Sequence, residues 1–526
     1  MSTRLTIGLV DDDAGWIELL RQIGVRFGRL DWNRLDARGY SAIITNRPLS
    51  PDEASLVEAY LRAGGAVLDT GGVADRLSLA TRTRSVRRIV DARSPFERTW
   101  LVDVEDRIES LDEAGSLART VALGEHGGGW LAHVPFDVGS IVRGSRMARR
   151  RFHAPSGHHP DEIVARIPLN PYRVIVESAL EWLHARRGLP YAHLWYFPDD
   201  ARSVFAYRID SDYGTPEHML RLRAIADDQG VPMTLFLHVG AHEEHIGLFR
   251  DFAGHELAAH GYRHRTFSSY EANWGNIAEA RQVMATAGLH PTGFAAPTGR
   301  WNRGLDRALA DQGFSYSSEF TLDYDGLPFF PIIGARRSSV LQMPIHPVSV
   351  GNLARAHAPA GAVDEYYQAV IDRQLAHRAP VILYHHPLQE AWSTVAAIFE
   401  RARAEGIAMT TMGAYAAWWR ERDAARFEAS VDDDAVTLSV PAAADRLCLR
   451  IVAPDGREAF VPTGRPGVPT AAEQATNVEH AIAIASLPWR AAPDSITPPS
   501  NLAAIRRPTL TMLRHSLEDA IARFRQ

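Results

Sequence analysis

Strand and helix signals alternate along most of this 526-residue chain, and this alternation restricts the fold more than any other feature. In the first third, short apolar runs at 5–10, 41–45 and 66–68 alternate with helical spacing at 14–27 and 51–62. Strands that alternate with helices form an open parallel sheet with helices on both faces. We therefore expect an α/β fold in which this first region carries such a sheet.

The same alternation returns between residues 196 and 422. We expect strands at 204–209, 233–239 and 381–384, and helices at 216–229, 276–287, 303–312, 364–377 and 392–405. Repeated β/α units over about 220 residues are typical of a barrel-like fold, here expected to be distorted, with active residues at the carboxyl ends of its strands.

The last hundred residues change character. Alternating apolar residues predict strands at 436–440 and 447–452, and Asp455-Gly456 after them is typical of a hairpin turn. A proline-rich loop and a final helix at 508–524 complete the chain. The prediction is thus three parts: an α/β domain at 1–195, a barrel-like domain at 196–422, and a small β-rich domain with a terminal helix at 423–526.

Bulk properties exclude several classes of protein. The net charge of −6 offers no electrostatic footprint for nucleic acid. The single cysteine, Cys448, excludes an intramolecular disulfide and any metal site with two thiolates. No apolar run approaches the length of a membrane span, and the first residues read as a strand rather than a signal peptide. We therefore expect a cytoplasmic protein, whose oligomeric state the sequence leaves open.

Two carboxylates follow the apolar run at 204–209. Asp210 and Asp212 are two residues apart, so on a continuing strand both would face one side. Neighbouring carboxylates raise each other's pKa unless a cation lies between them. A metal bound to one would leave the other free to act as a base; the alternative is a solvated turn, which Gly214 favours.

Histidines are the other candidate ligands. His260 and His264 are four residues apart, a spacing that allows two imidazoles to bind one metal ion. Composition alone supplies about one such pair by chance in a chain with 22 histidines. A second pair, His238 and His242, trails off a strand and is interpreted as surface or loop histidines. His386, before Pro387, is a further candidate at the end of the strand at 381–384.

The first region resembles the glutamine-amidotransferase-like, flavodoxin-like fold in the segments 40–44, 49–53 and 60–65. Working members carry a nucleophilic cysteine, and no cysteine precedes Cys448, so the resemblance implies a domain without that chemistry. A receiver domain is the rival, because Asp11-Asp12-Asp13 could form an acidic pocket. The strand at 41–45 ends in Asn46, however, and the three aspartates are better interpreted as a solvated turn that caps the next helix.

The middle region resembles the polysaccharide deacetylases of the NodB-homology type, carbohydrate esterase family four, over about residues 200–420. The motifs that carry the resemblance are the aspartate pair, the two histidines four apart, and the histidines before Pro387. The resemblance implies that Asp210 is the catalytic base and His386 the acid, that the metal ligands are Asp212, His260 and His264, and that Pro297, Trp301 and His385 bind substrate. Trp301 would form a wall of the site, and His385 is the alternative acid.

One family feature is missing. The family places an arginine that orients the base where this chain has Ala295, and Thr298 replaces the usual aromatic residue. Arg208 and Arg300 are the two candidates to compensate.

The resemblance implies hydrolysis of an N-acetyl group on an amino sugar, possibly the precursor of a surface glycan. Asp210 would take a proton from water and His386 would protonate the departing amine. One divalent metal ion is implied; zinc is favoured, and cobalt and other divalent ions also suit the ligands. Two alternatives stay open: hydrolysis of another C–N bond on the same scaffold, and a catalytically inactive carbohydrate-binding protein.

Overall fold

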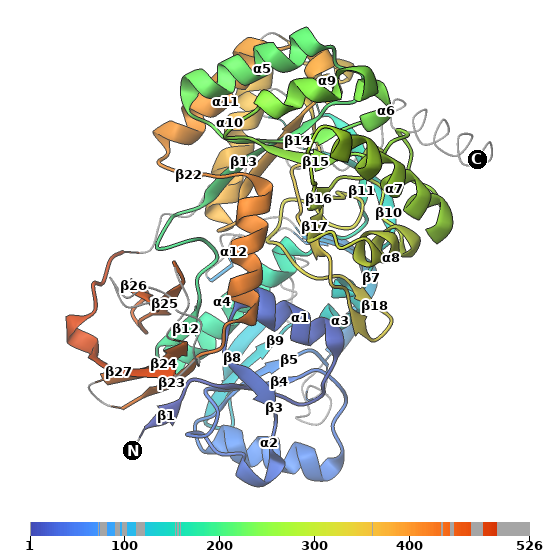
Figure 1. Ribbon diagram of the computed structural model, residues 1–526. Helices are drawn as coiled ribbons and strands as arrows, with labels where there is room; N and C mark the ends of the chain where they lie inside the picture. Colours follow the sequence, from blue (N-terminus) through green and yellow to red (C-terminus); the bar gives the residue numbers. More distant parts are fainter. Residues whose placement is uncertain are drawn as a thin grey trace.

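The computed structural model describes residues 2–71, 73, 81–89, 95–96, 102–111, 121–152, 154, 157, 159–359, 361–432, 435–441, 446–463 and 477–491. The chain forms a mixed α/β structure in which a helix-covered sheet of the middle region lies beside a second sheet from the first region (Figure 1). The helix expected at 508–524 lies outside the described residues. Within the described part, the chain contains no helix long and apolar enough to cross a bilayer.

The central sheet of the middle region is a curved parallel sheet. Its strands follow the order β20-β17-β16-β15-β14-β13-β21, with β22 also paired to β13. The bounds are β13 Val204–Asp210, β14 Met233–Leu237, β15 Glu256–Ala259, β16 Gly293–Phe294, β17 Tyr316–Ser317, β20 Leu341–Gln342, β21 Val381–His385 and β22 Ala408–Met409. Among the described residues no ladder joins β20 to β21, so the expected barrel is incomplete.

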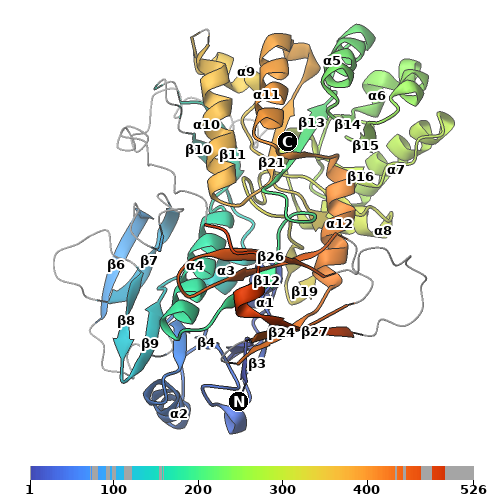
Figure 2. The same ribbon diagram turned by 90° about the vertical axis from the view of Figure 1, so that its left-hand side faces the viewer.

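Helices cover the outside of this sheet (Figures 1 and 2). They are α5 Pro216–Gln229, α6 Val239–His242, α7 Tyr270–Thr286, α8 Arg303–Asp311, α9 Val350–Arg355, α10 Ala362–Ala376, α11 Trp392–Ala404 and α12 Met412–Ala424. The predicted helix at 216–229 is confirmed. Thr215 accepts a hydrogen bond from the His218 amide at its start, and Gly230, with φ 64°, ends it.

The core beneath these helices is built from the strands themselves. All seven residues of β13 are buried, as are all five of β14 and of β21. On the helix side of the sheet, the rings of Tyr207 and Phe399 meet edge to face at 4.8 Å. Strands buried on both faces read as continuous apolar runs, which is why the sequence revealed them. The polar residues at their ends therefore stand out.

The first region carries a second sheet, ordered β3-β2-β4-β5-β9-β8. It is parallel from β3 to β9, and β8 runs antiparallel to β9. The bounds are β2 Ile7–Leu9, β3 Phe27–Arg29, β4 Ala42–Thr45, β5 Ala66–Asp69, β8 Ala122–His126 and β9 Gly129–His133, with helices α1 Ala14–Ile23, α2 Pro51–Arg62, α3 Val138–Val142 and α4 Asn170–Arg186.

Local signals explain the helices of this region. The predicted helix at 51–62 is confirmed, with Ser50 and Glu53 forming a capping box at its start. The helix expected at 14–27 ends earlier, at Ile23, because Gly24 adopts φ 86° and terminates it. The interpretation of the aspartates as a helix cap is confirmed for Asp13, which accepts a hydrogen bond from the Trp16 amide.

The C-terminal strands pair with strands from much earlier in the chain. β1 (Thr3–Arg4) pairs with β23 (Glu428–Val431), and β12 (Tyr191–Leu194) pairs with β25 (Cys448–Val452). The predicted hairpin is confirmed, because β25 pairs with β26 and Gly456 between them has φ 87°. The remaining strands are β6 Thr81–Ile89, β7 Val102–Leu111, β10 Met147–Arg151, β11 Asp161–Ala165, β18 Ile332–Ile333, β19 Arg336–Arg337, β24 Ala435–Pro441, β26 Glu458–Pro462 and β27 Asn477–Ala483.

Candidate active site

The candidate catalytic residues gather at the carboxyl ends of neighbouring strands. Asp210 is the last residue of β13, and His260 directly follows β15. His386 directly follows β21, which pairs with β13. Because the strands are parallel, their carboxyl ends share one edge of the sheet, where active sites of such folds form.

Three of the predicted residues could hold a metal ion. One donor atom each from Asp212, His260 and His264 lies within 4.8 Å of the other two. Asp212 Oδ1 is 2.9 Å from His264 Nε2 and 3.4 Å from His260 Nε2. The three side chains therefore converge on one point, as the sequence predicted.

The route by which Asp212 reaches this point differs from the expectation. The strand ends at Asp210, and Ser211–Gly214 forms a turn closed by a hydrogen bond of 2.8 Å between the Gly214 amide and the Ser211 carbonyl. Asp212 in this turn has φ 40°. Aspartate tolerates this left-handed region better than most residues, and such outliers cluster at functional sites. Asp212 is thus placed beside His260 and His264 by a turn, not by strand alternation.

The surroundings of these side chains fit a metal ion. Asp212 Oδ1 is buried and makes no hydrogen bond of good geometry with any described residue, although two imidazole nitrogens lie close to it. His260 Nδ1 lies 2.7 Å from the Ala295 carbonyl oxygen, so it carries the proton and leaves Nε2 free as a donor to a metal. An outer partner of this kind is typical of metal-bound histidines. One oxygen and two nitrogens suit zinc and related divalent cations.

Arg208, one of the two candidates to replace the arginine missing at position 295, contacts Asp210. Its guanidinium donates two hydrogen bonds to Asp210, of 2.6 Å from Nε and 2.7 Å from Nη2. It also donates to the Ser318 carbonyl and hydroxyl oxygens, at 2.7 and 3.0 Å. Arg208 and Asp210 are two residues apart on one strand and so share a face. Of the two candidates, Arg208 is the one that contacts the carboxylate.

This contact sets the charge of Asp210, whose side chain is almost fully buried. Burial by itself would raise the pKa of Asp210, but the guanidinium of Arg208 and the nearby imidazoles of His260 and His386 hold the pKa below its ordinary value. The carboxylate is therefore ionised at neutral pH. An ionised carboxylate beside a metal-binding group is what a general base requires.

His386 completes the group of polar side chains. Its Nε2 is 3.5 Å from Asp212 Oδ2, and its ring lies edge-on to Tyr384. Its Nδ1 is buried and has no hydrogen-bond partner among the described residues. Burial lowers the pKa of His386, while Asp210 and Asp212 act in the opposite direction. His386 thus faces the carboxylates.

His385 lies apart from these residues. It is fully buried and stacks against Tyr207, with Trp392 edge-on to it. It is paired in register with Ile209, so its side chain lies on the helix side of the sheet, opposite to that of Arg208. The structure does not bring His385 to the site, and burial lowers its pKa to about 3.

Pro297 and Trp301 are the other two predicted substrate-binding residues. Pro297 is buried, and its carbonyl accepts a hydrogen bond from the Thr266 hydroxyl, in the segment that follows His264. Trp301 is half-buried and packs against the hydrophobic core of the first region. The indole of Trp301 therefore packs between the sheet of the middle region and the sheet of the first region.

Two histidines interpreted as surface or loop residues, His238 and His242, are buried. His238 is 5% and His242 is 2% exposed. His238 directly follows β14, the neighbour of β13, and its Nδ1 lies 3.1 Å from the Asp212 carbonyl oxygen. Its ring is 5.2 Å from that of His264. The sequence signal for His238 was its position directly after a strand next to β13. Its four-residue spacing from His242 did not reveal this.

Tyr213 is a further residue of the site that the sequence did not single out. It follows Asp212 and is 62% exposed. Its ring centre lies 5.0 Å from that of His238 and 5.9 Å from that of His264. An exposed aromatic ring held beside the metal-binding residues offers an apolar surface at the entrance.

Comparisons with known proteins agree with the position of this site. A family model described as polysaccharide deacetylase matches residues 208–317, which include Arg208, the aspartate pair, His260 and His264. This segment therefore contains a polysaccharide deacetylase domain. No curated protein matches the chain.

Several solved structures are similar to part of this chain. A putative polysaccharide deacetylase from Mycobacterium smegmatis shares 21% identity, with 43% of this chain and 92% of that chain covered and a TM-score of 0.36. A pseudoenzyme of carbohydrate esterase family 4 from Bacillus anthracis shares 15%, with 41% and 65% covered and a TM-score of 0.31. A family 4 carbohydrate esterase from Streptomyces lividans, in complex with acetate, shares 14%, with 41% and 94% covered and a TM-score of 0.28.

Proposed function

We propose that this protein is a metal-dependent hydrolase that removes the N-acetyl group from an amino sugar. The observation that carries the proposal is the convergence of Asp212, His260 and His264 beside a second, ionised carboxylate, Asp210. The match of residues 208–317 to the polysaccharide deacetylase family supports the same chemistry.

Hydrolysis breaks the C–N bond of the acetamido group and leaves acetate and a free amine. Asp210 accepts a proton from the attacking water, and Arg208 holds this carboxylate in one orientation through two hydrogen bonds. His386 donates a proton to the amine nitrogen as the bond breaks. A divalent ion, held by Asp212, His260 and His264, would supply positive charge that activates water and polarises the amide oxygen.

The direct test is acetate release from oligomers of N-acetylglucosamine by the purified, zinc-loaded protein. We expect acetate and a stoichiometric free amine, and we expect Asp210→Asn to release neither at a comparable rate. Acetate release that is unchanged in Asp210→Asn would exclude this site as its source. An exposed aspartate such as Asp455, replaced by asparagine, is the matched control.

Two alternatives differ from this proposal in measurable ways. Hydrolysis of another C–N bond predicts metal content without acetate release from acetylated sugars. An inactive carbohydrate-binding protein, which Ala295 favours, predicts sugar binding without a stoichiometric metal. Arg208 counts against the inactive alternative, because it supplies the guanidinium that Ala295 lacks.

We also propose a role for the first region, within the partition 1–195, 196–422 and 423–526. The parallel order β3-β2-β4-β5-β9 supports a flavodoxin-like, glutamine-amidotransferase-like domain. The absence of cysteine before Cys448 supports a scaffold or recognition surface without amidotransferase activity. Glutamine-dependent ammonia release by the full chain would contradict this proposal. A cytoplasmic location and a surface-glycan precursor as substrate belong to the same proposal.

A further inference from the structure

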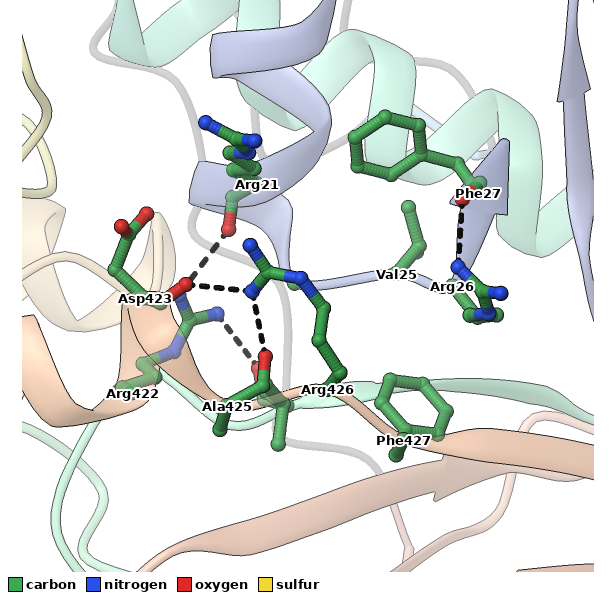
Figure 3. A pocket seen from close by; sticks show the side chains of 11 residues that line it. Arg21, Val25, Arg26, Phe27, Arg422, Asp423, Ala425, Arg426 and Phe427 are labelled. Atoms are coloured by element: carbon green, nitrogen blue, oxygen red, sulfur yellow. Dashed lines mark hydrogen bonds between the residues drawn. The ribbon is translucent and has the colours of Figure 1, made fainter. Parts of the chain in front are cut away.

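A pocket of about 200 Å³ lies far from the candidate active site, where three distant segments of the chain meet (Figure 3). The first segment is the end of α1 with the start of β3, the second is Leu194 at the end of β12, and the third is the end of α12 with the residues before β23. The lining residues are Arg21, Gly24, Val25, Arg26, Phe27, Leu194, Arg422, Asp423, Ala425, Arg426 and Phe427.

The helix α12 separates this pocket from the catalytic carboxylates. The amide of Met412, its first residue, donates to Thr234 near the start of β14, which is the end of the strand opposite to the active site. The 13 residues of α12 then span about 20 Å before they reach the pocket. Figure 1 shows α12 running from the central sheet toward the sheet of the first region. The pocket is therefore a separate site.

Positive charge dominates the pocket. Four arginines and one aspartate line it. Asp423 is already bound by Arg337, through hydrogen bonds of 2.7 and 2.6 Å, and Arg337 also binds Glu18. Glu428 pairs with Arg26 at 2.7 Å. Together with these partners the pocket holds five guanidinium groups and three carboxylates, which leaves an excess of two positive charges.

Two of the arginines have no carboxylate partner. The side chain of Arg21 is half-buried and makes no hydrogen bond or ion pair with the described residues. Arg426 donates only to the backbone carbonyls of Asp423 and Ala425. Burial lowers the pKa of Arg426, the like charges of Arg21, Arg337 and Arg26 lower it further, and the nearby Asp423 acts in the opposite direction. An anion between these groups would relieve their repulsion.

The rest of the pocket is apolar. Figure 3 shows Phe27, Phe427 and Val25 on one side together with Arg26, and Arg21, Arg422 and Arg426 on the other. The guanidinium of Arg422 is occupied by hydrogen bonds within the fold, because it donates to the carbonyls of Trp195, Ile23 and Leu194. The volume is below the range of about 300–1,000 Å³ that is typical of drug-sized ligands. A small ligand with an anionic end and an apolar face fits this arrangement.

We propose that this pocket binds a small organic phosphate monoester, with Arg21 and Arg426 on the phosphate group and the two phenylalanines beside the organic part. Arginine is the preferred partner of phosphate because its planar guanidinium donates two parallel hydrogen bonds. The ligand would join α1, β12 and the α12–β23 connection, which come from three parts of the chain. Binding should therefore raise the melting temperature of the protein, and the rise should continue with the logarithm of ligand concentration above the dissociation constant.

The test is calorimetric titration of the full-length protein with glucose 6-phosphate, inorganic phosphate and glucose at constant ionic strength. We expect glucose 6-phosphate to bind more tightly than inorganic phosphate and glucose to give no binding heat. Because a charged hydrogen bond typically contributes enough for about a tenfold change in affinity, Arg21→Gln should weaken binding of the ester about tenfold. Arg426→Gln should do the same, and it serves as the second variant should Arg21→Gln unfold.

Arg29→Gln is the matched control. Arg29 lies three residues after Arg26, is 71% exposed at its side chain and does not line the pocket. Its replacement removes the same charge and should change the affinity less than about twofold. Equal weakening by Arg29→Gln, or no binding of either phosphate by the wild-type protein, overturns the proposal. Tighter binding of inorganic phosphate than of the ester overturns the assignment of an organic ligand. None of these outcomes depends on deacetylase activity, so this proposal and the proposed function fail separately.

Discussion

Removal of Arg208 tests the most unusual feature of the candidate active site. Its guanidinium meets the Asp210 carboxylate at 2.6 and 2.7 Å, so the charge centres lie about 4 Å apart. At an effective dielectric constant of about 20 this attraction is about 4 kcal/mol. Arg208→Met would leave Asp210 buried without its cation, and breaking such a pair typically costs about 3–5 kcal/mol.

A double variant separates the contribution of the Arg208–Asp210 ion pair from the other effects of removing Arg208. Arg208→Met with Asp210→Asn leaves no buried unpaired charge, so we expect it to be more stable than Arg208→Met alone by about 2 kcal/mol or more. Hydrogen exchange of peptides that cover β13 measures the free energy of opening of this strand directly. Strictly additive effects of the two substitutions would refute the reasoning. Metal content should stay unchanged throughout, because neither residue is an expected ligand.

Three further predictions concern this site and Glu319, a fully buried residue whose Oε1 accepts a hydrogen bond from the Ala296 amide. His264→Ala should remove the expected single metal ion, measured by elemental analysis, whereas His242→Ala should retain it; full metal in the first variant contradicts the ligand assignment. Asp210→Asn should keep the metal and lose about 10²–10⁴-fold in turnover, whereas Asp212→Asn should be partly rescued by added metal. If excess metal rescues Asp210→Asn instead, the two roles are reversed. Burial raises the pKa of Glu319 to about 7 from the ordinary 4.5, so unfolding releases its proton between these values. Stability relative to Glu319→Gln should therefore fall by about 3 kcal/mol as the pH rises through this window, which melting temperatures at pH 5 and 8 would detect. Equal differences at both pH values would contradict the sign.

Local signals were enough to predict several of the helices. The helix at 51–62 was recognisable from Ser50 and the proline after it, and the helix at 216–229 begins with a proline and ends at Gly230. Both kinds of signal act within a few residues, so the sequence contains them completely. The early end of α1 at Gly24 is the same kind of signal, which the apolar spacing beyond it concealed.

Contacts between distant segments could not be predicted in the same way. The pairing of β12 with β25 joins residues more than 250 positions apart, and the sequence of neither strand indicates the strand with which it pairs. The burial of His238 has a similar origin, because it depends on β14 lying next to β13. Periodicity assigns an element and its buried face, but not the element against which that face packs.

Arg208 and Ala295 show where residue-by-residue transfer from a family reaches its limit. The resemblance implies a guanidinium at the Asp210 carboxylate, and this interaction depends on the position of the donor atoms rather than on the strand that supplies them. A strand places residues two apart on the same face, so Arg208 can reach the carboxylate from within β13 itself. An arginine side chain at 295 is then not needed for this contact, and the backbone carbonyl of Ala295 accepts the hydrogen bond from His260 that leaves Nε2 free. The missing arginine is therefore weak evidence for an inactive protein, because the interaction that it would supply is present.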